Sequence, residues 1–294
     1  MRLTSRSLIE HDLRSAAATL DAGFADYFVR VAFTTTTLLE MVRTDSVDLA
    51  SSLAFFAGDE PVGVALIARR GWTSRLATMS MVASARRRGF GLQCIERLVA
   101  DAQGRGERAM ELEVIERNHP AIALYQRCGF TTVDRLISLS RPPSKCHSVS
   151  SFPVEVDVRE VAAMVTSNAG DTLPWQLSGE SIAQLGAPFR GYRLGDSWAV
   201  IGDPSSPVIS IRALVTQRDA RGRGHATALL QALTALHPDR AWRVSALCPE
   251  RASRPFERAG WKRDELSQLR MRRDTTPPDH GPIEAQPSAT TDPR

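Results

Sequence analysis

A short basic, glycine-rich segment is the part of this sequence best suited to hold a ligand. Residues 86–91 read RRRGFG and lie between an apolar, β-rich run and a stretch with helical periodicity. At a helix start the backbone N–H groups lack intrahelical partners and the helix dipole adds positive charge, so phosphate is attracted there. The segment therefore predicts a phosphate or pyrophosphate site. Alternatively, its glycines only shape the turn and its arginines only face water.

The same pattern occurs a second time in the chain. Residues 221–226 read RGRGHA, again between an apolar run and a helical stretch. Each copy is followed by a similar closing run, LYQRCGF at 124–130 and PFERAGW at 255–261. Internal repetition of this kind predicts two related domains.

We place the two predicted domains at 1–140 and 152–273. Residues 141–151 are polar and contain prolines, which is typical of a linker. Residues 274–294 offer almost nothing apolar to bury, which predicts a disordered tail.

Composition excludes several classes of protein. The chain has 294 residues, of which 43% are hydrophobic and 24% charged, so disorder of the whole chain is excluded. The formal charge of +4 is small and is not gathered with aromatic residues, so we expect no nucleic-acid partner. No run is long and apolar enough for a membrane span or a secretion signal, which predicts a cytoplasmic protein without membrane contact. The four cysteines are scattered, so we expect no metal site and no disulfide framework.

The order of apolar runs predicts an α/β or α+β fold, with a mixed twisted sheet flanked by helices. The second repeat follows the same order less clearly. In the first repeat we expect helices within 8–42, strands near 48–57, 62–69 and 76–82, a helix near 91–103, a strand at 109–115, a short helix at 119–128 and a last strand at 131–140.

The motifs together resemble a known superfamily. The combination RxxGxG, then LEV at 112–114, then NxxAxxLYxxxGF at 118–130 is similar to the GCN5-related N-acetyltransferase (GNAT) superfamily. Within it, the core looks most like the enzymes that acetylate the N-terminal alanine of a ribosomal protein. The second repeat matches in weaker form, which implies two tandem GNAT-like domains. In such domains two central parallel strands splay apart and acyl-CoA lies in the gap.

The resemblance also assigns a binding role to residues near the turn. It implies that Met81 and Val82 pair their backbone with the pantetheine arm and offer an N–H to the thioester oxygen. Asn118 would contact the same arm, although a residue of this type before Pro120 would also make a good N-cap. The pyrophosphate would lie on the backbone amides of Arg87, Arg88, Gly89, Phe90, Gly91 and Leu92.

Two residues are implied in catalysis. Tyr125 would face the thioester sulfur and protonate the departing thiolate. Glu113 matches the position of the general base, because a protonated amine must lose a proton before it can attack. Glu111 or a water molecule remain alternatives as the base. Both glutamates could also lie on a polar sheet face, and Tyr125 could be a core aromatic residue.

The second repeat departs from this pattern. Phe256 stands where the first repeat has Tyr125, and Pro249 stands where it has Asn118. We therefore expect the second domain to be non-catalytic, with coenzyme A binding left open.

The resemblance thus implies an N-acetyltransferase whose N-terminal domain moves an acetyl group from acetyl-CoA, its co-substrate, directly to an amine. The acceptor is a small molecule or a peptide. Phe24, Tyr27, Phe33 and the threonine run at 34–37 are candidates to line its site, and neither its identity nor the oligomeric state follows from the sequence. The alternative function is a non-catalytic regulatory module that binds acyl-CoA.

Overall fold

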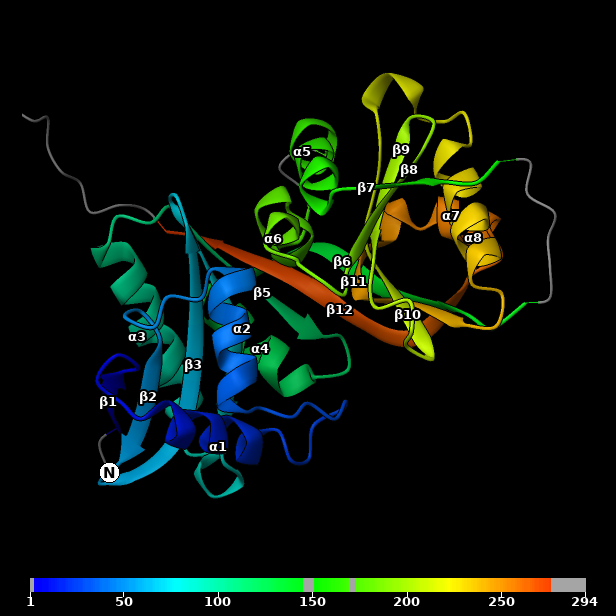
Figure 1. Ribbon diagram of the computed structural model, residues 1–294. Helices are drawn as coiled ribbons and strands as arrows, with labels where there is room; N and C mark the ends of the chain where they lie inside the picture. The colour runs from blue at the N-terminus through cyan, green and yellow to red at the C-terminus, as the bar shows by residue number, and fades with distance from the viewer. Residues whose placement is uncertain (1–2, 145–150, 170–172, 276–294) are drawn as a thin grey trace, which may run out of the picture.

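The computed structural model describes residues 3–144, 151–169 and 173–275. One continuous twelve-stranded sheet runs through these residues, with helices packed on its faces (Figure 1). The expected α/β architecture is therefore confirmed. The strands are β1 (Leu3–Ser7), β2 (Leu53–Ala57), β3 (Glu60–Arg70), β4 (Thr73–Met81), β5 (Ala109–Ile115), β6 (Thr131–Arg141), β7 (Val154–Val156), β8 (Arg190–Leu194), β9 (Ser197–Ile201), β10 (Val208–Thr216), β11 (Ala241–Pro249) and β12 (Lys262–Asp274).

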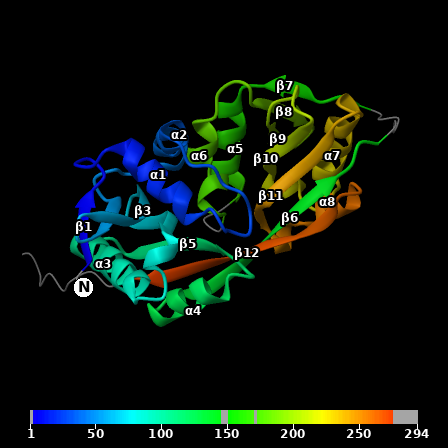
Figure 2. The ribbon, with the colours of Figure 1, turned by 90° about the horizontal axis from the view of Figure 1, so that it is seen from below.

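Helices cover both faces of the sheet. Figure 2 shows α1 and α2 on one side of the N-terminal strands and α3 and α4 on the other. The longer helices are α1 (Leu13–Gly23), α2 (Thr35–Asp45), α3 (Phe90–Gly104), α4 (His119–Arg127), α5 (Val158–Ala169) and α7 (His225–Leu236), and the short ones are α6 (Gly179–Ala183) and α8 (Arg254–Arg258).

The central strands are apolar on both faces because both faces are covered. In β3, Ala65 and Ile67 pack towards α3, while Val64 and Leu66 pack towards α1 and α2. All four side chains are fully buried. A strand buried in this way is a nearly continuous hydrophobic run, which is why its position was predictable from the sequence.

The N-terminal segment differs from the expectation of helices within 8–42. The chain begins with strand β1, which pairs antiparallel with β2, before helix α1 starts at Leu13. Thr34 then caps α2 through a reciprocal capping box with Thr37. Residues 24–34, between these two helices, form no regular element. Strand β1 is short and half-exposed, so its hydrophobic pattern was too weak to indicate it.

The central parallel strands of each half separate after a few residues. β4 and β5 pair in parallel only from Thr73 opposite Ala109 to Leu76 opposite Leu112. β10 and β11 pair only from Val208 to Ser210. Just beyond these points β4 and β10 each carry a bulge, at Ala77 and Arg212, against the neighbouring antiparallel strand. Bulges bend a strand and re-aim its side chains, so each half gains a gap between its central strands.

The last strands of the two halves are exchanged. β12 lies between β5 and β6, and β6 in turn lies between β12 and β11. β12 pairs with β5 over residues 268–274, and β6 pairs with β11 over residues 136–141.

The division of the chain into 1–140 and 152–273 therefore stays a prediction, because the sheet itself crosses it. Most of the predicted linker, with Cys146, and nearly all of the predicted tail lie outside the described residues.

No helix among the described residues is long and apolar enough to span a bilayer. The same residues contain no group of three or more His, Cys, Asp or Glu side chains placed to hold a metal ion.

Candidate active site

The predicted phosphate-binding turn leads directly into a helix. α3 begins at Phe90, and Gly89 before it has a left-handed backbone with φ of 79°. Arg87 is also left-handed, with φ of 62°, which is unusual for a residue with a side chain. Left-handed residues in a turn direct successive N–H groups to one side and create a concave anion site. The geometry of residues 87–91 therefore fits a phosphate group.

Arg86 holds this turn in place. Its guanidinium donates to the carbonyl oxygens of Met81 at 3.0 Å and Gly23 at 2.8 Å, and to Asp26 at 2.6 Å. These contacts join the end of β4, the end of α1 and the turn. Arg86 is therefore a positioning residue, which leaves Arg87 and Arg88 as the arginines of the turn suited to face a ligand.

Met81 and Val82, at the end of β4, were predicted to offer a backbone N–H to the thioester oxygen. The two N–H groups are not equally free to do so. The Val82 N–H donates to the carbonyl of Val62 at 2.9 Å, so it is not free to bind a thioester oxygen. Successive N–H groups of a strand point to opposite sides, so the N–H of Met81 points away from β3. Of the pair, only Met81 has its N–H directed towards the gap between β4 and β5.

A cavity of about 370 Å³ lies at this gap, on the side of the sheet covered by α1 and α2. Glu113 and Asn118 both line it, so the structure brings together two of the predicted site residues. Aromatic side chains that were candidates for the acceptor side form another wall: Phe24, Tyr27 and Phe33. Leu266 and Gln268 of the exchanged strand β12 complete the lining, so both halves of the chain build this cavity.

Of the residues that the structure describes, Glu113 is the one charged residue that lines this cavity, and it is held by Arg75. Its Oε2 accepts from Arg75 Nε at 2.8 Å, with a second guanidinium nitrogen at 2.7 Å. The two side chains are only 4% and 5% exposed. Oε1 of Glu113 is buried and has no hydrogen-bond partner among the described residues. One oxygen is therefore fixed by the protein, and the other remains to accept from a ligand or a water molecule.

Glu111, the alternative base, lies on the same face of β5 but is engaged elsewhere. Its carboxylate pairs with Arg270 at 3.3 Å and with Arg272 at 3.1 Å. It does not line the cavity. Of the two glutamates, only Glu113 faces the space that an acceptor could occupy.

Asn118 and Tyr125 are linked through helix α4. Asn118 caps this helix by accepting from the N–H of Ala121, as expected for an N-cap. Tyr125, further along α4, packs edge-on to Phe130 at 6.0 Å between ring centres. Burial, and secondarily the nearby Tyr27, raise the pKa of the Tyr125 phenol. Tyr125 does not line the cavity, so its predicted place beside a thioester stays a prediction.

Two residues of this site were not predicted to take part in its chemistry. Arg75 is a charged residue inside an apolar strand, and a charge at such a position could have indicated a role in the site. Burial raises the pKa of Tyr27, partly offset by a hydrogen bond with Asn118. Tyr27 lies within residues 24–34, which form no regular element, so neither a motif nor an apolar periodicity in the sequence indicated that it contacts Asn118.

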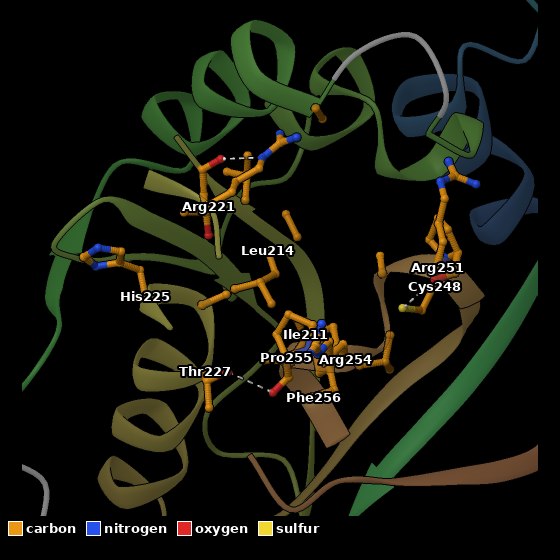
Figure 3. Close-up of a pocket in the computed structure, with 18 of the residues that line it drawn as sticks. Ile211, Leu214, Arg221, His225, Thr227, Cys248, Arg251, Arg254, Pro255 and Phe256 are labelled. Carbon is orange, nitrogen blue, oxygen red and sulfur yellow. Dashed lines mark hydrogen bonds between the residues drawn. The ribbon is translucent and has the colours of Figure 1, made fainter. Parts of the chain in front are cut away.

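A second and larger cavity lies in the C-terminal half, in the corresponding gap next to β10 (Figure 3). Its volume is about 600 Å³. The turn at 221–226 borders it, and Gly222 and Gly224 have φ of 78° and 90° before α7 starts at His225. Both copies of the motif therefore adopt the same left-handed turn before a helix.

The comparisons with known proteins agree with this geometry. Residues 23–130 match the family model described as the acetyltransferase (GNAT) family. None of the curated proteins matches the sequence. A GCN5-related N-acetyltransferase from Sphaerobacter thermophilus has a similar structure, with a TM-score of 0.69 at 16% identity, over 94% of this chain and 96% of its own.

Two further solved structures share the fold. A tandem GNAT protein from the clavulanic acid biosynthesis pathway superposes with a TM-score of 0.64 at 16% identity, over 95% of this chain and 100% of its own. Eis1 from Mycobacterium abscessus superposes with a TM-score of 0.59 at 13% identity, over 93% and 74%. Residues 23–130 therefore match the GNAT family model, and the chain as a whole shares the fold of solved GNAT structures, one of which is a tandem GNAT protein.

Proposed function

We propose that the chain is an N-acetyltransferase that moves the acetyl group of acetyl-CoA to an amine, with its active site in the N-terminal half. The GNAT fold supports acyl transfer from acyl-CoA. The observation that carries the finer proposal is Glu113, which lines a cavity between splayed strands and has one carboxylate oxygen fixed by Arg75 and the other buried without a hydrogen-bond partner among the described residues.

In this proposal the coenzyme pyrophosphate binds the amides of residues 87–92, and the pantetheine arm follows the gap beside Met81. The acceptor enters the cavity as an ammonium ion, for which an ionised carboxylate is a suitable partner. Glu113 Oε1 takes one proton from the ammonium, directly or through water, and frees its lone pair.

The amine nitrogen then forms a bond to the thioester carbonyl carbon. Negative charge that develops on the carbonyl oxygen is stabilised by a backbone N–H of β4. The carbon–sulfur bond breaks, and the departing thiolate takes a proton from the Tyr125 phenol. The second proton that the amine nitrogen loses as the amide forms returns through water to the phenolate. Because both substrates are bound together, no covalent enzyme intermediate is needed and positioning supplies much of the acceleration.

The residues that line the cavity indicate which kind of amine could bind there. One carboxylate set among Phe24, Tyr27 and Phe33 favours an amine whose neighbouring group is apolar or aromatic. A small amine and the N-terminus of a peptide both have this chemistry.

The test is release of the coenzyme thiol from acetyl-CoA across a panel of primary amines and short peptides. We expect Glu113→Gln to lower kcat/KM by about 100-fold or more, since general-base catalysis contributes about 10²–10⁴. Glu60→Gln, at the exposed start of β3, is the matched control and should leave the rate unchanged. If no amine is acetylated although acetyl-CoA binds, the regulatory-module alternative holds instead.

A further inference from the structure

The larger cavity, in the C-terminal half, has a composition unlike that of the first. Its middle is apolar, with Ile211, Leu214, Val244 and Phe256 in its walls. In Figure 3, Arg221 and His225 lie at one end of this cavity and Arg251 and Cys248 at the other, with Leu214 between them. The cavity therefore suits an elongated ligand with an apolar central part.

The charge of this cavity is strongly positive. None of the Asp or Glu residues that the structure describes lines it, whereas the lining arginines are Arg212, Arg221, Arg251, Arg254 and Arg258. Asp134 pairs with Arg251 from outside the lining. Arg221 donates to the carbonyl oxygens of Thr216 and Asn168, which leaves its charge uncompensated by these contacts. A surface with this excess attracts a ligand with more than one negative charge.

Arg212 is the arginine that most needs an anionic partner. It occupies the bulge of β10, and its Nε is buried with no hydrogen-bond partner among the described residues. Its nearest aromatic ring, Phe189, lies 5.9 Å from the guanidinium carbon. A buried donor without a hydrogen-bond partner is costly, and Asp45 attracts the guanidinium only through space. A carboxylate that enters the cavity would remove this cost.

The two positive regions of the cavity are well separated. Arg212 precedes the end of β10 at Thr216 by four residues, which spans about 13 Å in a strand. The left-handed turn at 221–224, with the free N–H groups at the start of α7, follows directly. A ligand that reaches both regions needs phosphate at one end and a second anionic group at the other.

We propose that the C-terminal cavity is a second binding site, for a phosphorylated ligand whose far end carries a carboxylate that Arg212 binds. A coenzyme A thioester of a dicarboxylic acid has this chemistry, with its phosphates at 221–225 and its apolar arm between. This site is separate from the proposed function, which concerns the N-terminal cavity.

The experiment compares succinyl-CoA with butyryl-CoA, which have acyl chains of equal carbon number but differ in the terminal carboxylate. Because the proposed N-terminal site also binds coenzyme A thioesters, isothermal titration of the full chain should resolve two sites. One of them should bind succinyl-CoA at least about tenfold more tightly than butyryl-CoA, the ordinary gain from one charge-assisted hydrogen bond. Arg212→Met should abolish this preference. Arg254→Met, an exposed arginine of the same cavity, should weaken both ligands equally and keep the preference.

Equal affinities for the two thioesters in the unmodified protein would refute the site, as would a preference that survives in Arg212→Met. If that variant does not fold by circular dichroism, Arg212→Lys, which keeps the charge but loses the forked donor, should retain part of the preference, and Arg212→Gln should lose it. Absence of acetyl transfer would contradict the proposed function and would leave these affinities unchanged, so the two failures are distinguishable.

Discussion

The pair formed by Arg75 and Glu113 offers the sharpest test of the site. Both side chains are at most 5% exposed, and two guanidinium nitrogens lie within 2.8 Å of one carboxylate oxygen. Removing one partner of a buried pair costs about 3–5 kcal/mol of folding free energy, because the other charge is left buried and alone. Replacing both by apolar groups is often neutral or stabilising by about 1–4 kcal/mol.

The two single replacements should not reduce the free energy of unfolding by equal amounts. In Glu113→Leu, Arg75 keeps Asp45 at 3.7 Å as a remaining negative charge. In Arg75→Met, both Glu113 and the 15%-exposed Asp45 lose their neutralising partner. We therefore expect Arg75→Met to lie at the upper end of the range and Glu113→Leu at the lower end. The double variant should recover most but not all of the stability, because Asp45 still lacks Arg75.

The measurement is urea unfolding of the four proteins followed by circular dichroism, with acetyl transfer measured in parallel. The double variant should recover most of the stability while remaining inactive, which separates folding from catalysis. A coupling energy near zero, or single variants that each cost less than about 1 kcal/mol, would show that the pair is not buried and held as described.

Three further predictions concern other parts of the chain. Tyr125→Phe should lower kcat by about 100-fold, and since burial raises the pKa of this phenol, the unmodified enzyme should show no alkaline loss of activity from Tyr125 below about pH 10 in its pH–rate profile. Trp175→Ala should cost about 3–5 kcal/mol in urea unfolding, because this buried ring stacks under Arg70 at 4.3 Å and its indole N–H donates to the Asp45 carbonyl at 2.7 Å. Burial raises the pKa of Cys94 and of Cys248 to about 12, so a thiol reagent at pH 8 should modify both only after unfolding, as a colour assay in urea would show.

Local signals in the sequence predicted most elements of the first half. The helix near 91–103, the strand at Ala109–Ile115 and the N-cap at Asn118 depend on neighbouring residues. The strand and the N-cap are confirmed, and the helix is found one residue longer at each end, at Phe90–Gly104. The exchange of β6 and β12 depends on pairing between segments more than 120 residues apart, and nothing in the apolar pattern of either strand distinguishes one partner from another.

The candidate site was likewise predictable from the sequence only where the signal was local. Motif spacing indicated Glu113, and the structure places it in a cavity. Arg75 went unnoticed because the predicted strand began at Leu76, one residue too late, so its side chain was not seen to share a face with Glu113. The availability of the Val82 N–H could not be predicted either, since it depends on which carbonyl of β3 lies opposite.

The two halves share one fold but place different charged residues at the gap between their central strands. Counting along each central strand from the first parallel pair places Ser210 where the N-terminal half has Arg75, and Ser245 where it has Glu113. The bulge position, Ala77 in the first half, is Arg212 in the second. The second half therefore has no carboxylate at this position to accept a proton from an amine, and it has an arginine at the bulge that suits an anionic ligand. These differences change the chemistry of the gap while the turn before the helix stays the same, which is why we propose that the second half binds a phosphorylated ligand and does not catalyse transfer.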